Sequence, residues 1–176
     1  MRRDRGYTLA AVQEVLTNVG PPPGTSGLNA VGFFAGYLVL DALTGNTDRH
    51  PGNWALLESD RDGTRYLAAT YDHGSALGAG LTEKNRSTRR AKDFAAKGRA
   101  NPFSPKGQLL VDLAHEAVSK ANAGRWISRV DQMDKATVRA VLTAPNGRLS
   151  PVASTFIEGV ILENRRRLCD DYPAKD

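Results

Sequence analysis

Residues 45–74 have the sequence GNTDRHPGNWALLESDRDGTRYLAATYDHG. The stretch is polar and rich in turn-forming residues at both ends, and it contains two short apolar runs, residues 54–57 and 66–71. An Asp-Gly pair at residues 62–63 lies between these runs, and such a pair is a strong local signal for a β-hairpin. We therefore expect a hairpin that brings the two polar ends of the stretch together.

Helical patterns flank this hairpin. Apolar residues on one face predict a short helix over residues 8–16, and residues 29–43, apolar on nearly all sides, predict a buried central helix. A Pro- and Gly-rich loop at residues 20–28 separates the two. Further helical patterns follow at residues 108–121, 125–130, 135–142 and 151–169. We predict a mainly α fold with one small β-hairpin, forming a single domain over residues 1–176.

Composition agrees with one soluble domain. The chain has 176 residues, of which 40% are hydrophobic and 24% charged. Its most apolar run, residues 30–40, is far shorter than the roughly 20 residues that a membrane-spanning helix needs. The one cysteine, Cys169, excludes a disulfide within the chain and fits the cytoplasm, which we expect as the location. The net charge of +5 favours anionic partners without choosing among them.

The polar ends of residues 45–74 carry the residue types that phosphoryl transfer needs. Transfer from ATP requires Mg²⁺ on the phosphates, oxygen ligands for that ion, and a group that orients the acceptor hydroxyl. In kinases the base Asp precedes a metal-binding Asn by five positions, a hairpin follows, and an Asp-x-Gly motif comes next. Asp48 and Asn53 have this spacing, and Asp72-His73-Gly74 has this form. We predict a kinase-type site using Mg²⁺ and ATP, in which Gly74 permits an unusual backbone angle after the metal ligand.

The wording of the two loops adds a family resemblance. Residues 48–53 look like the Asp-Arg-His-x-x-Asn catalytic loop of phosphatidylinositol 3- and 4-kinases. Residues 45–53, followed by the Tyr-Asp pair at residues 71–72, look still more like the C-terminal lobe of HipA-like bacterial toxin kinases, which carry a Gly-x-Thr-Asp-x-His-x-x-Asn loop. The resemblance implies a protein-kinase-like C-lobe in which the hairpin carries the catalytic and metal loops.

The resemblance also implies a role for each matching residue. Asp48 would orient or deprotonate the acceptor hydroxyl, and Asn53 and Asp72 would bind Mg²⁺ and, through it, ATP. His50 occupies the histidine position of the family, with either a catalytic or a loop-bracing role. Protein serine or threonine is the implied acceptor, with lipid as the alternative, and an antitoxin is a conceivable partner chain.

A complete kinase also has an N-lobe, with a Gly-rich loop over the phosphates and a lysine on its third strand. No lysine precedes Lys84, and residues 20–28 lack the Gly-x-Gly-x-x-Gly form. We therefore expect a C-lobe without its N-lobe, which needs that lobe for activity. A catalytically inactive, kinase-derived binding module and a lipid-kinase-like enzyme are the alternatives.

Residues 81–107 form a basic segment at the position of a kinase activation segment. Eight basic residues stand against two acidic ones, and we expect an exposed, partly helical, mobile segment, or alternatively a disordered loop. Ser87, Thr88 and Ser104 are candidate phosphorylation sites, whose added charge would pair with nearby arginines. Nucleic acid is a weaker candidate partner, because Phe94 and Phe103 are the only aromatic residues available for stacking there. We expect structural roles for the two histidines outside the catalytic loop, at positions 73 and 115.

Overall fold

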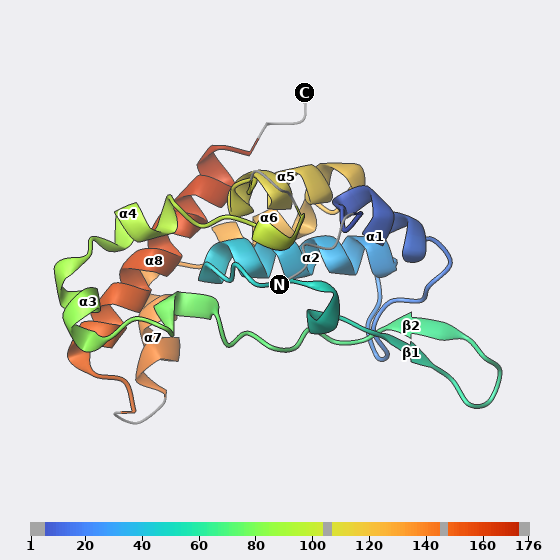
Figure 1. Cartoon of the computed structure of the whole chain (residues 1–176), viewed down its shortest axis with the longest axis horizontal. Helices are drawn as coiled ribbons and strands as arrows, with labels where there is room; N and C mark the ends of the chain where they lie inside the picture. The colour runs from blue at the N-terminus through green and yellow to red at the C-terminus, as the bar shows by residue number, and fades with distance from the viewer. Residues whose placement is uncertain (1–5, 104–106, 145–147, 173–176) are drawn as a thin grey trace.

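The computed structural model describes residues 6–103, 107–144 and 148–172. Within these ranges the chain is mainly helical with one antiparallel hairpin, which confirms the predicted fold class (Figure 1). The elements are α1 (Leu9–Val15), α2 (Ala30–Thr44), β1 (Leu56–Glu58), β2 (Arg65–Leu67), α3 (Glu83–Thr88), α4 (Ala91–Ala95), α5 (Leu110–Lys120), α6 (Arg125–Asp131), α7 (Lys135–Thr143) and α8 (Pro151–Asp170).

Helix α2 is the central helix that the sequence predicts. The side chain of Asn29 caps its start by accepting a hydrogen bond from the backbone N–H of Gly32 at 2.9 Å. Gly45 ends it in the left-handed conformation with φ 68°, which glycine adopts at little steric cost. The helix is buried nearly all round, between α5 and α8. The predicted catalytic loop therefore begins at a helix end that is fixed in the core.

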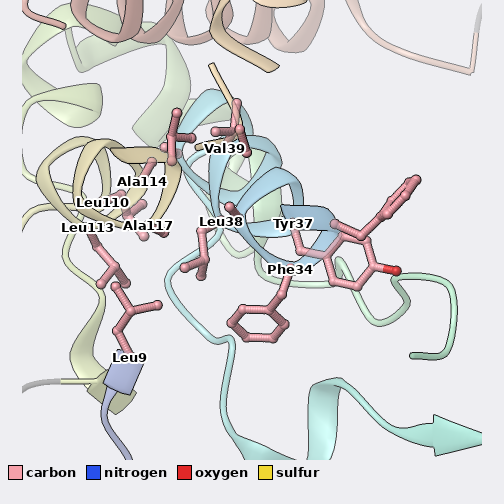
Figure 2. Close-up of a cluster of buried hydrophobic side chains, with 14 of the residues drawn as sticks. Leu9, Phe34, Tyr37, Leu38, Val39, Leu110, Leu113, Ala114 and Ala117 are labelled. Atoms are coloured by element: carbon pink, nitrogen blue, oxygen red, sulfur yellow. The ribbon is translucent and has the colours of Figure 1, made fainter. Parts of the chain in front are cut away.

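The hydrophobic core forms around α2. Figure 2 shows Leu38 pointing from α2 toward the face of α5 that carries Leu113 and Ala117, with Leu9 of α1 beside them. Leu9 was predicted to share a buried face of a short N-terminal helix, and the structure confirms this. Trp126 of α6 closes another side of α2, donating its indole N–H to the carbonyl of Gly32 at 2.8 Å. The core therefore rests on helix faces whose apolar periodicity is readable in the sequence.

Helix α8 packs along several other helices. It contacts α2, α5, α6 and α7 and, at its outer side, α3 and α4 (Figure 1). Within it, Asn164 is buried and donates to the carbonyl of Leu43 at 3.2 Å, next to the end of α2. Helix α8 therefore joins the end of α2 to the helices that follow the hairpin.

The hairpin is shorter than predicted. Strand β1 starts at Leu56 and β2 ends at Leu67, and these two residues pair with each other. The longer strands that we expected over residues 54–57 and 66–71 are wrong in extent. The N–H of Ala68 still donates to the carbonyl of Ala55 at 2.9 Å, but the carbonyl of Ala68 accepts from Tyr37 Oη at 2.7 Å. Gly20, the first residue of the predicted Pro/Gly loop, pairs with β2 on its other side.

The basic segment, residues 81–107, is ordered into α3 and α4 over much of its described part. Both helices pack on α8, and Phe94 meets Phe156 edge to face at a centroid distance of 5.4 Å. The partly helical character that we expected is confirmed, and the alternative of a disordered loop is wrong for the described part, because Phe94 and Ala95 give the segment an apolar side to bury. Ser104 lies outside the described residues.

Two single residues of the C-terminal half lie at or near α8. Cys169 is half-buried on this helix, and burial raises the pKa of its thiol. His115 has the expected structural contact, since its Nε2 lies 3.0 Å from the carbonyl oxygen of Leu168. None of the helices in the described ranges combines the length and the apolarity that crossing a membrane requires.

Candidate active site

A buried ion pair lies beneath the predicted catalytic loop. Arg49 approaches both carboxylate oxygens of Asp41, with Nε 2.8 Å from Oδ2 and Nη2 2.7 Å from Oδ1. Their side chains are 3% and 1% exposed. Asn46 also donates to Asp41, at 2.8 Å, so the carboxylate accepts several hydrogen bonds. This bidentate geometry fixes the start of the loop onto the last turn of α2.

Arg49 also connects the loop to the end of the hairpin. Its Nη1 donates to the carbonyl of Asn53 at 2.6 Å and to the carbonyl of Tyr71 at 3.3 Å. A second bond runs in parallel, because Tyr71 Oη donates to the carbonyl of Gly52 at 3.1 Å. The two predicted motifs, one ending at Asn53 and the other starting at Asp72, are therefore held side by side by one guanidinium group and one phenol.

Asn53 has the geometry of an oriented oxygen ligand. It is 2% exposed, and its Nδ2 donates to the backbone carbonyl of Asp48 at 2.6 Å. This bond uses the nitrogen of the amide and leaves Oδ1 without a hydrogen-bond partner in the described part of the chain. A side-chain oxygen fixed in this way is suited to a hard cation.

Asp48 is held through its backbone while its carboxylate stays available. The backbone N–H donates to Oδ1 of Asn46 at 3.3 Å, and the carbonyl accepts from Asn53. The residue is half-buried, and no hydrogen bond reaches its carboxylate from residues 6–103, 107–144 or 148–172. A positioned carboxylate without an internal partner is what a hydroxyl-orienting group needs.

His50 braces the loop. Its Nδ1 accepts a hydrogen bond from the backbone N–H of Gly52 at 3.0 Å, which caps the short 3-10 turn Pro51–Asn53. The sequence left two roles open for His50, catalytic or loop-bracing, and this contact is a loop-bracing one. It stabilises the turn that contains Asn53.

Asp72 is exposed and has φ 53°, the left-handed region that few residues other than glycine adopt. We expected the unusual backbone angle at Gly74, and that prediction is wrong, since Gly74 is not among the residues with positive φ. Both the carbonyl and the hydroxyl of Tyr71 are hydrogen-bonded, so the chain turns at the following residue, Asp72. Strain of this kind at an exposed side chain is typical of functional positions.

The structure therefore brings Asp48, Asn53 and Asp72 onto adjacent segments. In the described part of the chain, no three His, Cys, Asp or Glu side chains gather as a metal site. The predicted metal ligands are instead one amide oxygen, from Asn53, and one carboxylate, from Asp72. This pair fits Mg²⁺, which takes oxygen ligands from few protein groups and keeps several waters. His73, which we expected to be structural, lies with Nε2 3.4 Å from the hydroxyl of Thr70.

Sequence reasoning missed the residues that hold the site together. Arg49, Asp41 and Asn46 received no role, although all are buried and hydrogen-bonded to one another. One signal was available: Asp41 is the only charged residue in α2, which is otherwise apolar or small. A lone carboxylate in a buried helix requires a partner, because an unpaired buried charge is strongly destabilising.

A cavity of about 640 Å³ opens beside the site. One wall comes from the catalytic loop and the residues after Asp72, and the other from the end of α3, from α4 and from the residues that follow it.

No protein-family model and no curated protein sequence matches the chain. Among solved structures, the chain is similar to the proinflammatory kinase CtkA of Helicobacter pylori, with a TM-score of 0.62 and 17% sequence identity. The match covers 93% of this chain and 61% of CtkA, so the chain spans less than two thirds of that kinase. At this identity the similarity shows the fold, which is kinase-like.

Proposed function

We propose that the chain is the C-terminal lobe of an ATP- and Mg²⁺-dependent phosphotransferase of the HipA-like kind, which acts on serine or threonine of a protein. The observation that carries the proposal is the bridge made by Arg49. One buried guanidinium binds the end of the catalytic loop and the residue before Asp72, at the positions where kinases place their base and metal ligands.

The proposed roles follow from which side-chain atoms of the described residues have hydrogen-bond partners and which do not. Asn53 Oδ1 and the Asp72 carboxylate would hold Mg²⁺, which would supply positive charge to neutralise the phosphates of ATP. Asp48 would orient the acceptor hydroxyl and receive its proton. The hydroxyl oxygen forms a bond to the γ-phosphorus, the bond from that phosphorus to the bridging oxygen breaks, and ADP leaves.

An ATP-clamping lobe is a separate part of the proposal. The Gly-rich loop and phosphate-binding lysine of kinases have no counterpart before Lys84. CtkA, with the same fold, is longer than the matched region. We infer that activity needs a second lobe, supplied by the same polypeptide or by a partner chain.

A phosphotransfer assay tests the proposal. Labelled ATP and Mg²⁺ are supplied to the chain alone and to the chain extended by its upstream coding region, with bacterial protein extract or phosphatidylinositol vesicles as acceptor. We expect transfer to protein by the extended form, a loss of about 10²–10⁴-fold in Asp48→Ala, and a comparable loss in Asp72→Asn. Asp60→Asn, an exposed hairpin carboxylate, is the matched control and should keep full activity.

The outcomes separate the alternatives. Transfer to lipid alone would replace the protein acceptor with a lipid one. Absence of transfer in the extended form would overturn the enzyme proposal and leave a kinase-derived binding module. Equal activity of Asp48→Ala and the parent would remove Asp48 from the mechanism.

A further inference from the structure

One wall of the cavity beside the site comes from residues that neighbour the proposed catalytic ones in sequence. Thr47 directly precedes Asp48, and Ser75 follows the Asp72 motif. An acceptor hydroxyl that approaches Asp48 along this wall would therefore carry its flanking residues into the cavity, whose volume of about 640 Å³ is large enough for several side chains.

The opposite wall is basic. It presents Arg89, Arg90 and Lys97 against one carboxylate, Asp93. In the described ranges neither Arg89 nor Lys97 has an acidic side chain within ion-pair distance, and Arg90 has a loose contact with Asp93 at 3.9 Å. A hollow lined mainly by one sign of charge attracts ligands of the opposite sign.

This basic wall is anchored to the core. Phe94 packs on Phe156 of α8, and Arg167 of α8 donates to the carbonyl of Ala95 at 3.1 Å. Figure 1 shows α3 and α4 beside α8, at the end of the molecule opposite the hairpin. The three cations lie on the residues that flank α4, a helix fixed to the same core that positions the predicted catalytic loop.

We propose that this cavity binds an acidic stretch of the protein acceptor, with Arg89 and Lys97 pairing with carboxylates next to the phosphorylated residue. The proposal rests on the proposed function and adds the class of acceptor. Nucleic acid fits less well, because Phe94, the one aromatic residue of the lining, is committed to Phe156 and is not free to stack on a base.

Peptide binding in the absence of ATP tests this inference separately from catalysis. A fluorescent peptide with one serine flanked by aspartate and glutamate is titrated with the chain, beside the same peptide with asparagine and glutamine in their place. The double variant Arg89→Ala/Lys97→Ala is compared with Arg61→Ala/Arg65→Ala, which removes the same charge from exposed hairpin positions. Circular dichroism confirms that both variants fold.

We expect the acidic peptide to bind more tightly than the neutral one, and the cavity variant to bind it about five- to tenfold more weakly, as for the loss of two solvent-accessible ion pairs. The hairpin variant should bind within about twofold of the parent. Arg89→Glu/Lys97→Glu should instead prefer a peptide with lysine in place of the acids.

Equal affinity for the acidic and neutral peptides, or equal losses in the cavity and hairpin variants, would overturn the proposal. Tighter binding of a single-stranded oligonucleotide that the cavity variant abolishes would assign the cavity to nucleic acid instead. Loss of phosphotransfer with intact acidic-peptide binding would count against the catalytic proposal alone.

Discussion

Replacing Arg49 with alanine removes the group that joins the two loops of the candidate site. The loss leaves Asp41 with a single side-chain partner, Asn46, and leaves the carbonyls of Asn53 and Tyr71 without their guanidinium donor. Because Asp41 is 1% exposed, its charge cannot be compensated by water. Breaking a buried pair by removing one partner costs about 3–5 kcal/mol. That is a large share of the roughly 5–15 kcal/mol by which a domain is stable.

The magnitude can be checked by a double-mutant cycle. Urea unfolding of Arg49→Ala, Asp41→Ala and the double variant is followed by tryptophan fluorescence, since the chain has two tryptophans. We expect each single variant to lose about 3–5 kcal/mol and the double variant to lose less than their sum by at least about 2 kcal/mol. Arg49→Lys should lose about 1–3 kcal/mol, because an ammonium group cannot reproduce the fork.

Arg65→Ala is the control, because Arg65 is exposed on β2 and its loss should change stability by no more than about 0.5 kcal/mol. A loss below about 1 kcal/mol in Arg49→Ala would refute the reasoning, since a buried charge would then have been left unpaired at little cost. So would strictly additive losses in the double variant.

Three further changes have definite expected results. Asp72→Gly should abolish Mg²⁺-dependent transfer but change the free energy of unfolding by less than about 1 kcal/mol, because relief of the strained φ offsets the backbone entropy of glycine. A larger loss of stability in urea unfolding would make Asp72 a structural residue. Gly36→Ala should destabilise the protein by about 1–3 kcal/mol in the same assay, since the new Cβ would lie 2.6 Å from the ring of Trp126. An unchanged urea midpoint of unfolding would contradict this packing. Burial raises the pKa of Tyr37 to about 12, so the free energy of unfolding should fall as pH rises from about 10 to 12, because the unfolded chain loses the tyrosine proton first. Unfolding measured over this pH range should show a smaller fall for Tyr37→Phe, and an identical fall would assign the effect to another group.

The local elements could be predicted because their signals lie within a few residues. Thr8 and Asn29 each cap a helix whose apolar pattern follows directly, and both helices begin where the sequence places them. The hairpin was found from its Asp-Gly turn, but its ends were not, because the carbonyl of Ala68 is bound by Tyr37, a residue 31 positions earlier in the chain. Edges of elements depend on such distant partners, whereas their centres depend on local pattern.

The candidate site divides in the same way. The sequence by itself determined the order and spacing of Asp48, Asn53 and Asp72, and the hairpin between them, because residue type and turn chemistry are local properties. Only the tertiary structure decided that Arg49 is the bridge, and that the strained backbone falls at Asp72. It also placed the basic residues that flank α4 across a cavity from the predicted catalytic loop, through contacts with α8. The physical reason is that a buried charge needs a partner, and tertiary packing decides which residue comes close enough to be that partner. The neighbouring sequence does not identify it.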